Sequence, residues 1–265
     1  MKGRLLTLYR KEVLDLMRNR VALVPVVLVA LIALAMPFVI AIAVPAVTHQ
    51  PLGADADLVR ISRIVEAGDR VSDSGRVELF LFQQFLIVFL LMPITGAMSL
   101  AAHAIVGEKQ ARTLEPLLAT PISTFELLIA KVLGALVPTM AISNAALAVY
   151  FIGIAATAEP GVLQAMLTLR TLLLVAVVAP LCALVSLQFA VVVSSRVNDP
   201  RTAQQFGVLI ILPLTALLVA QFTGSMWLTN STIVLVGGAL LIVWVLLVVF
   251  SVAIFDREAI LTRWK

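Results

Sequence analysis

Long apolar runs separated by short polar segments dominate this chain. Six of the runs match or exceed the length of about 20 residues that an α-helix needs to cross a bilayer. They cover residues 21–47, 79–106, 125–156, 166–194, 206–226 and 232–255. The pattern predicts an all-α integral membrane protein with six transmembrane helices. Because the runs occupy most of the sequence, we expect residues 1–265 to form a single transmembrane domain.

The composition agrees with this prediction and excludes several other classes. Of the 265 residues, 62% are hydrophobic and 13% are charged, which is far from the balance of a soluble domain. The formal net charge is +4, but the basic residues lie beside the ends of the runs and form no aromatic-interleaved patch, so we expect no nucleic-acid partner. The single cysteine, Cys182, excludes an intramolecular disulfide and a cysteine metal cluster.

The distribution of basic residues predicts the orientation in a cell (inner, cytoplasmic) membrane. Six basic residues precede the first run, whereas the short segments after the third and fifth runs contain none. By the positive-inside rule both termini therefore face the cytoplasm. The segment 48–78 has arginines, but its acidic residues outnumber them, and we place it outside as an external loop. The first run is too long for a signal-peptide core and is interpreted as a retained span.

The polar segments flanking the runs predict short amphipathic elements. Residues 1–20 place apolar side chains at helical spacing among basic ones, which predicts an amphipathic interfacial helix. The alternative is a plain cytoplasmic extension of the first span. Further along, Asp199 followed by Pro200 is a typical helix start, with an N-cap before a proline at the first helical position.

The polar segment 107–124 predicts a very short helix between two breakers. Thr113 caps its start, and Pro121 disfavours helix at the preceding residue and so ends it. Three apolar side chains share one face of this helix: Leu114, Leu117 and Leu118. The segment therefore predicts an apolar-faced helix where the membrane domain meets the cytoplasm. We also count Lys131 among the basic residues of this inner loop.

Polar and proline residues inside the runs make further predictions. Interior prolines kink helices, so we expect bent spans: Pro25, Pro37, Pro93, Pro138, Pro180 and Pro213. Single amides in a bundle more often form interhelical hydrogen bonds than bind substrate; the amides in question are Gln83, Gln84, Asn144, Gln188 and Gln221. Arg170, near the outer end of the fourth run, is expected to snorkel to the interface.

The chain has no motif for its own ATP hydrolysis or for metal chemistry. No GxxxxGK[ST] phosphate loop occurs in the sequence. The two histidines, His49 and His103, lie near opposite ends of the predicted spans and are not expected to share a metal. We therefore expect no catalytic residues, no metal site and no directly bound cofactor.

Residues between Glu108 and Lys131 resemble the first cytoplasmic loop of ABC-2 type ABC transporter permeases. The matching residues are Glu108, Thr113, Leu114, Glu115, Leu117, Leu118, Thr120, Pro121, Glu126 and Lys131. Arg112 stands where that family usually has glycine. Two other segments are similar to the family's N-terminal interfacial helix and second cytoplasmic loop. The residues concerned are Lys11, Glu12 and Arg18 in the first, and Asn198, Asp199 and Gln204 in the second.

The resemblance implies a non-enzymatic transmembrane subunit of an ATP-driven exporter. It would pair with a second permease copy or a homologue, and with a separate ABC ATPase subunit that binds ATP and Mg²⁺. Residues 114–119 would then be the coupling helix, docking its leucine face in a groove of the ATPase. Coupling contacts would come from Glu108, Thr113, Leu114, Glu115, Leu117 and Leu118.

Three other functions stay open. A secondary transporter would need ionisable groups at mid-membrane, and the spans offer almost none. An intramembrane hydrolase would need a base beside Ser186, Ser194 or Ser195. An ABC-like complex could instead transmit mechanical work to a partner without translocation. The substrate-binding residues are not assigned by the sequence, although the apolar spans favour a lipophilic compound, a lipid or a peptide.

Overall fold

The computed structural model describes residues 9–10, 14, 20–65, 71–110, 124–197 and 199–254. No strand occurs among these residues, so the all-helical prediction is confirmed. The elements are α2 (Arg20–Thr48), η1 (Leu52–Ala54), α3 (Ala56–Ser62), α4 (Asp73–Val88), α5 (Leu91–Gln110), α7 (Thr124–Thr157), α8 (Val162–Met166), α9 (Leu169–Leu173), η2 (Leu174–Val178), α10 (Ala179–Arg196), α11 (Pro200–Gln205), α12 (Val208–Phe222) and α13 (Asn230–Ile254).

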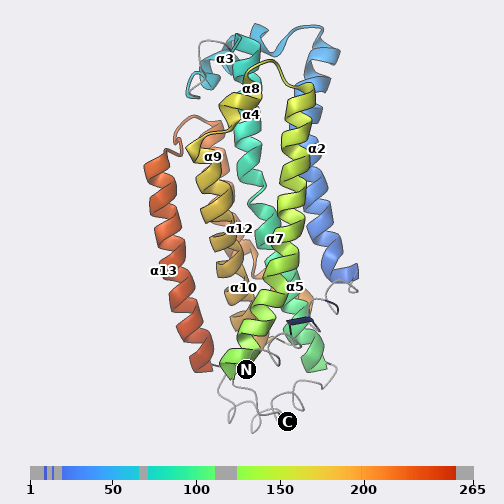
Figure 1. Ribbon diagram of the computed structural model, residues 1–265, viewed down its shortest axis with the longest axis vertical. Helices are drawn as coiled ribbons and strands as arrows, with labels where there is room; N and C mark the ends of the chain where they lie inside the picture. Colours follow the sequence, from blue (N-terminus) through green and yellow to red (C-terminus); the bar gives the residue numbers. More distant parts are fainter. Residues whose placement is uncertain are drawn as a thin grey trace.

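The long helices form an elongated bundle in which successive passes run in opposite directions (Figure 1). We call one end of the bundle the base end, where α2 begins, α5 ends, α7 begins and α13 ends. The opposite end, where α3 and α8 lie, is the cap end (Figure 1). The cap is formed by chain between α2 and α4 and between α7 and α9, and Ser72 and Thr168 cap α4 and α9 there.

Within the described residues, five helical segments are long and apolar enough to cross a membrane. They are Leu23–Thr48, Asp73–His103, Ile129–Thr157, Leu169–Ser194 and Asn230–Ser251. The predicted span 206–226 differs, because its helix α12 has only 15 residues. The turn at Phe206–Gly207 separates it from α11, which shortens the continuous apolar helix to less than the about 20 residues of a straight span.

The second predicted span, 79–106, is two helices rather than one. It begins earlier, at Asp73, and is interrupted at Phe89–Leu90 between α4 and α5. Pro93 has no N–H to donate to the carbonyl of Phe89, four residues before it. The N–H of Met92 bonds that carbonyl instead, at 3.2 Å, and the helix tightens locally.

The fourth predicted span, 166–194, has a similar irregularity. Its helical chain begins at Leu169, and residues Leu174–Val178 form a π-helical turn before α10. Pro180 removes one backbone donor, and the N–H of Ala179 bonds the carbonyl of Leu174, five residues earlier. The regular helix is therefore interrupted next to Pro93 and Pro180, whereas α2, α7 and α12 continue through their prolines.

An aromatic cluster joins α2, α4 and α7 at the centre of the bundle. The Tyr150 ring lies 4.7 Å from that of Phe89, 5.6 Å from that of Phe38 and 5.9 Å from that of Phe82, centre to centre. Its hydroxyl donates a 2.8 Å hydrogen bond to the carbonyl of Phe82. Such ring pairs stabilise a core beyond their buried area. The pass α4–α5 is consequently held from several sides, and α5 also packs against α2, α7, α10 and α11.

The peripheral helices expose broad apolar faces. On α13 the exposed side chains include Leu235, Ile242 and Leu246, and on α2 they include Val24 and Leu31. An apolar surface of this extent is stable only against lipid or another protein. The helix lengths and these faces together make the chain a multi-pass membrane protein.

Candidate functional site

Of the residues that the sequence assigns to ATPase coupling, the structure describes only the backbone of Glu108. Glu108 is in the last turn of α5, but its side chain is not described. Thr113, Leu114, Glu115, Leu117 and Leu118 lie outside the described residues, as do Lys11, Glu12, Arg18 and Asn198. The described parts nevertheless fix the attachment of the predicted coupling segment, because α5 ends and α7 begins at the base end (Figure 1).

The second predicted inner segment is ordered by a helix cap. The carboxylate of Asp199 accepts hydrogen bonds from the backbone N–H of Thr202, at 3.1 Å, and from its hydroxyl, at 3.2 Å. The backbone bond is the main reason why the pKa of Asp199 lies below its ordinary value. Helix α11 begins at Pro200 as predicted, carries Gln204, and packs against α5 and α10. The two predicted inner segments therefore adjoin the same central helix.

Lys131 differs from its sequence interpretation. We counted it among the charges of the first inner loop, although the predicted span 125–156 also contains it; the structure places it on α7 and buries it to 4% exposure. The helix starts at Thr124 and continues through this position, so the side chain is carried into the bundle. Helix packing, which the local sequence does not encode, decides this burial.

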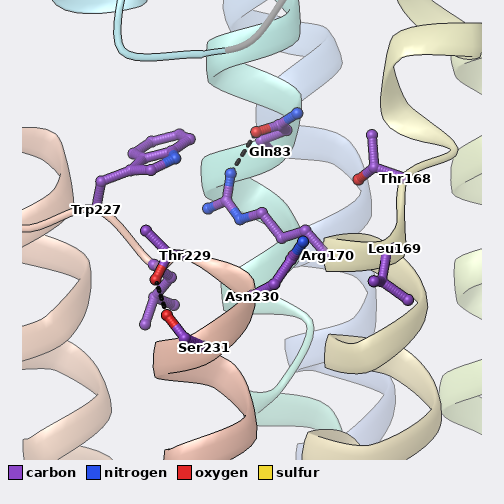
Figure 2. A pocket seen from close by; sticks show the side chains of 9 residues that line it. Gln83, Thr168, Leu169, Arg170, Trp227, Thr229, Asn230 and Ser231 are labelled. Atoms are coloured by element: carbon purple, nitrogen blue, oxygen red, sulfur yellow. Dashed lines mark hydrogen bonds between the residues drawn. The ribbon is translucent and has the colours of Figure 1, made fainter.

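A polar pocket of about 350 Å³ lies at the cap end. We call it the cap pocket. Its lining comes from α4, from the start of α9 and from the connection between α12 and α13 (Figure 2). The lining residues are Gln83, Thr168, Leu169, Arg170, Trp227, Leu228, Thr229, Asn230 and Ser231.

Two threonine caps shape the walls of this pocket. Thr168 Oγ1 accepts the N–H of Thr171 at the start of α9. Thr229 Oγ1 accepts the N–H of Thr232 at 3.3 Å, and it also lies 2.9 Å from the hydroxyl of Ser231 at the start of α13. Capping residues fix the entry direction of a helix. Both helices therefore begin at the pocket.

Arg170 spans the cap pocket. Its guanidinium donates a hydrogen bond from Nη1 to Oε1 of Gln83 on α4. Its Cζ lies 4.0 Å from the centre of the Trp227 ring, a cation–π contact. Figure 2 shows the side chain reaching from α9 between these two groups. Its Nε and Nη2 atoms are buried and have no hydrogen-bond partner among the described residues, so the guanidinium keeps unused donors.

An apolar cavity of about 240 Å³ adjoins the cap pocket at Leu228, which lines both. We call it the tail cavity. It lies among α5, η2, α10, α12 and α13. Its walls include Ile94, Val178, Cys182, Leu214, Ile233 and Val236. The cap pocket is therefore lined by a cation and polar groups, and the adjacent tail cavity by apolar side chains.

The described residues contain no group of three His, Cys, Asp or Glu side chains placed to hold a metal ion. His103, which we did not expect to share a metal with His49, places its Nδ1 2.9 Å from the carbonyl of Ser99, one turn earlier on α5. The chemistry that the cap pocket offers is recognition by charge, aromatic contact and hydrogen bonding.

Comparison with protein families gives a match over nearly the whole chain. The model of the ABC-2 family transporter proteins matches residues 6–253. The chain belongs to this family. It is a membrane transport permease of the ABC-2 type, as the loop residues indicated. None of the curated proteins matches the chain.

The cap pocket of this permease was missed by the sequence interpretation. Arg170 was expected to snorkel outward, but it points inward to Gln83 and Trp227. The prediction of interhelical amide bonds is confirmed at Gln83 and at Gln188, whose Nε2 donates to Ser251 Oγ at 2.6 Å. Gln83 and Arg170 are 87 residues apart. In the sequence, the available signal was Arg170 close to the short polar segment before the fourth predicted run. Only the fold could show that Arg170 pairs with Gln83.

Proposed function

We propose that this permease is the transmembrane subunit of an ATP-driven exporter in the cell (inner, cytoplasmic) membrane. Six spans, both termini in the cytoplasm and the base end facing the cytoplasm complete the proposed arrangement. A separate ABC ATPase, which binds ATP and Mg²⁺, would dock at the base end. A second copy of the chain or a homologue would complete the translocation pathway.

The observation that supports the proposal most is the position of α5. This helix leads directly into the predicted coupling segment and packs against α2, α7, α10 and α11. A force on residues 114–119 would therefore reach the centre of the bundle through one rigid element. The packing of α11 on α5 adds the second predicted inner segment to the same contact region.

Two interruptions of the helices between the base end and the cap end could bend under such a force. The break at Phe89–Leu90 and the π-turn Leu174–Val178 occur in neighbouring passes, and Leu90 and Leu174 both line the tail cavity. Interrupted helices absorb changes in direction more readily than continuous ones. We propose that closure of the ATPase pair moves the base half of α5 and α10, with these two interruptions as hinges.

The experiment that tests the proposal is co-purification of the permease with a co-expressed ABC ATPase. Leu117→Asp places a charge on the leucine face of the coupling helix, and we expect loss of the complex and of permease-dependent ATP hydrolysis. Leu117→Met keeps the apolar face and is the matched control. Recovery of each variant from the membrane fraction checks its insertion, and its size-exclusion profile in detergent checks its folding.

The outcomes separate the remaining functions. An intact, fully active complex with Leu117→Asp would contradict the docking assignment. Transport that persists without any ATPase and follows an ion gradient would instead make the chain a secondary transporter. An ATPase complex that hydrolyses ATP, remains sensitive to Leu117→Asp and moves no solute would be a device that transmits mechanical work to a partner.

A further inference from the structure

The cap pocket and the tail cavity follow each other along the same two helical passes. On the pass through α9, Arg170 lines the cap pocket, and Leu174 and Val178 line the tail cavity one and two turns further on. On α13, Ser231 lines the first and Ile233 the second. The two spaces therefore lie next to each other along these helices, with Leu228 in the lining of both; one is polar and the other is apolar.

The cap pocket is suited to an anion. The Nε and Nη2 donors of Arg170 are buried without a hydrogen-bond partner among the described residues, and a buried guanidinium donor is costly until an acceptor reaches it. The start of α13 also lines the pocket, and its dipole favours negative charge there.

Two acidic side chains of the cap end, Glu78 and Glu159, have other partners. Glu78 accepts the backbone N–H of Glu159 at 2.8 Å, and Glu159 accepts the hydroxyl of Ser72. No Asp or Glu is among the described residues that line the cap pocket. No ion pair neutralises Arg170 within the part of the chain that the structure describes. An acceptor that completes its hydrogen bonds would have to come from outside these residues.

The tail cavity is suited to an alkyl chain. Among the described residues, α12 packs against α4 and α5, whereas α13 packs against α10, η2 and α9. The tail cavity lies between these two packing units, and its lining residues are apolar side chains together with Cys182. Its apolar walls offer water no hydrogen-bond partners, so hydrocarbon fills such a cavity more favourably than water does.

We propose that the cap pocket and the tail cavity together bind one anionic amphiphile, with its acidic headgroup on Arg170 and its alkyl chain in the tail cavity. Carboxylates and phosphates share the chemistry that the guanidinium recognises, so a fatty acid and an anionic phospholipid are the two sources. The inference goes beyond the proposed function, because this binding requires neither the ATPase nor translocation.

Trp227 supplies a direct readout of occupancy. The chain has three tryptophans, and replacing Trp244 and Trp264 by phenylalanine leaves Trp227 as the single emitter beside Arg170. The purified full chain in detergent is titrated with brominated dodecanoate, whose bromines quench a nearby indole. We expect saturable quenching by this carboxylate and at least about tenfold weaker binding of its uncharged methyl ester, because a charge-assisted hydrogen bond is lost.

Variants test the headgroup contact. Arg170→Gln should weaken dodecanoate binding at least about tenfold, to the level of the methyl ester. Arg60→Gln is the matched control, because Arg60 is exposed on α3 at the same end and does not line the cap pocket. Arg170→Lys keeps the charge and should restore part of the affinity. The wild-type comparison of acid and ester remains decisive even where a variant does not fold.

Chain length and source are tested with two further probes. Brominated butyrate carries the same carboxylate but cannot fill the tail cavity, and it should bind much more weakly than dodecanoate. Nanodiscs that contain brominated phosphatidylglycerol should quench Trp227 more than matched phosphatidylcholine discs if a phospholipid is the natural occupant, and equally if a free fatty acid is. Equal quenching by dodecanoate and its methyl ester, or no change with Arg170→Gln, would overturn the proposal.

Discussion

The pass α4–α5 and the helix α13 are both apolar enough to cross a membrane, but they have opposite surroundings. In the apolar stretch of Asp73–His103, 78% of the residues are buried, against 11% in that of Asn230–Ser251. The buried pass carries polar side chains, such as Gln83, Gln84 and Ser99. The exposed helix presents apolar side chains and has one buried polar residue, Ser251, bonded to Gln188. Hydrophobicity therefore brings a helix into the membrane, and polar contacts and close packing select those in its centre.

The largest effect should come from removing an aromatic ring from the buried pass. Phe82 is 1% exposed and contacts Phe38 and Tyr150, so Phe82→Ala should reduce the free energy of unfolding by about 3–5 kcal/mol. The same substitution on α13, Phe250→Ala, is the matched control, because Phe250 is 54% exposed. Reversible unfolding in mixed micelles measures both. Equal losses would show that α13 is also packed against protein.

Substituting one glycine on α5 and one on α13 by alanine tests how closely each helix approaches its neighbours. A Cβ on Gly96 of α5 would meet Thr139 Cγ2 at 2.7 Å, and Thr139 is fully buried, so Gly96→Ala should cost about 1–3 kcal/mol of unfolding free energy. A Cβ on Gly238 of α13 meets nothing within 4 Å, so Gly238→Ala should gain up to about 1 kcal/mol from helix propensity. Unfolding in the same micelles should give these opposite signs. A stabilising Gly96→Ala would refute the close approach of α5 and α7.

A smaller effect is expected for the hydrogen bond that attaches α13. Gln188→Leu removes the donor to Ser251, and interhelical hydrogen bonds in membranes contribute about 0.6 kcal/mol on average and up to about 1.7 kcal/mol. Ser251→Ala removes the other partner, so a double-mutant cycle isolates the pair. A coupling energy of zero would mean that α13 is held by apolar packing alone.

The smallest effect is a pH dependence of the stability of helix α11 at the base end. We expect no such dependence for the pass α4–α5 or for α13. The pKa of Asp199 is lowered in the folded protein, mainly by the N–H of Thr202. Its contribution to stability is present above the unfolded pKa of about 4 and is lost as the pH falls through the lower folded value. The protection of the Thr202 amide against hydrogen exchange, relative to its intrinsic exchange rate at each pH, should fall over that window, and Asp199→Asn should remove this change. Unchanged protection would rule out a role of the carboxylate in capping α11.

The apolar runs predicted most helices well, because a backbone in lipid must satisfy its own hydrogen bonds and does so as helix. The helices α7 and α13 differ from the predicted ranges by one or two residues at each end. The breaks were harder to predict. Pro93 and Pro180 coincide with interruptions, but Pro25, Pro37 and Pro138 lie in continuous helices. The effect of each proline depends on its neighbours in space, which a local pattern does not contain.

The predicted coupling region and the cap pocket also differ in how far local sequence identifies them. The leucine face of the coupling segment and the cap at Asp199 depend on residues close together in the chain, so local rules identify them. The cap of α11 is confirmed, and the coupling helix stays a prediction. The cap pocket joins side chains from α4, α9 and the start of α13, and its central pair is 87 residues apart. Such a site has no local signature beyond an isolated cation.

The sequence by itself determined that this chain is a helical membrane protein of the ABC-2 type, because runs of apolar residues and a short charged loop are local features. Only the tertiary structure decided which passes are buried, that Lys131 and Arg170 point inward, and that a cationic pocket adjoins an apolar cavity. The physical reason is that lipid and protein interior are almost equally apolar. Hydrophobicity alone therefore does not distinguish them, and the fold does so through the packing and polar pairing of distant residues.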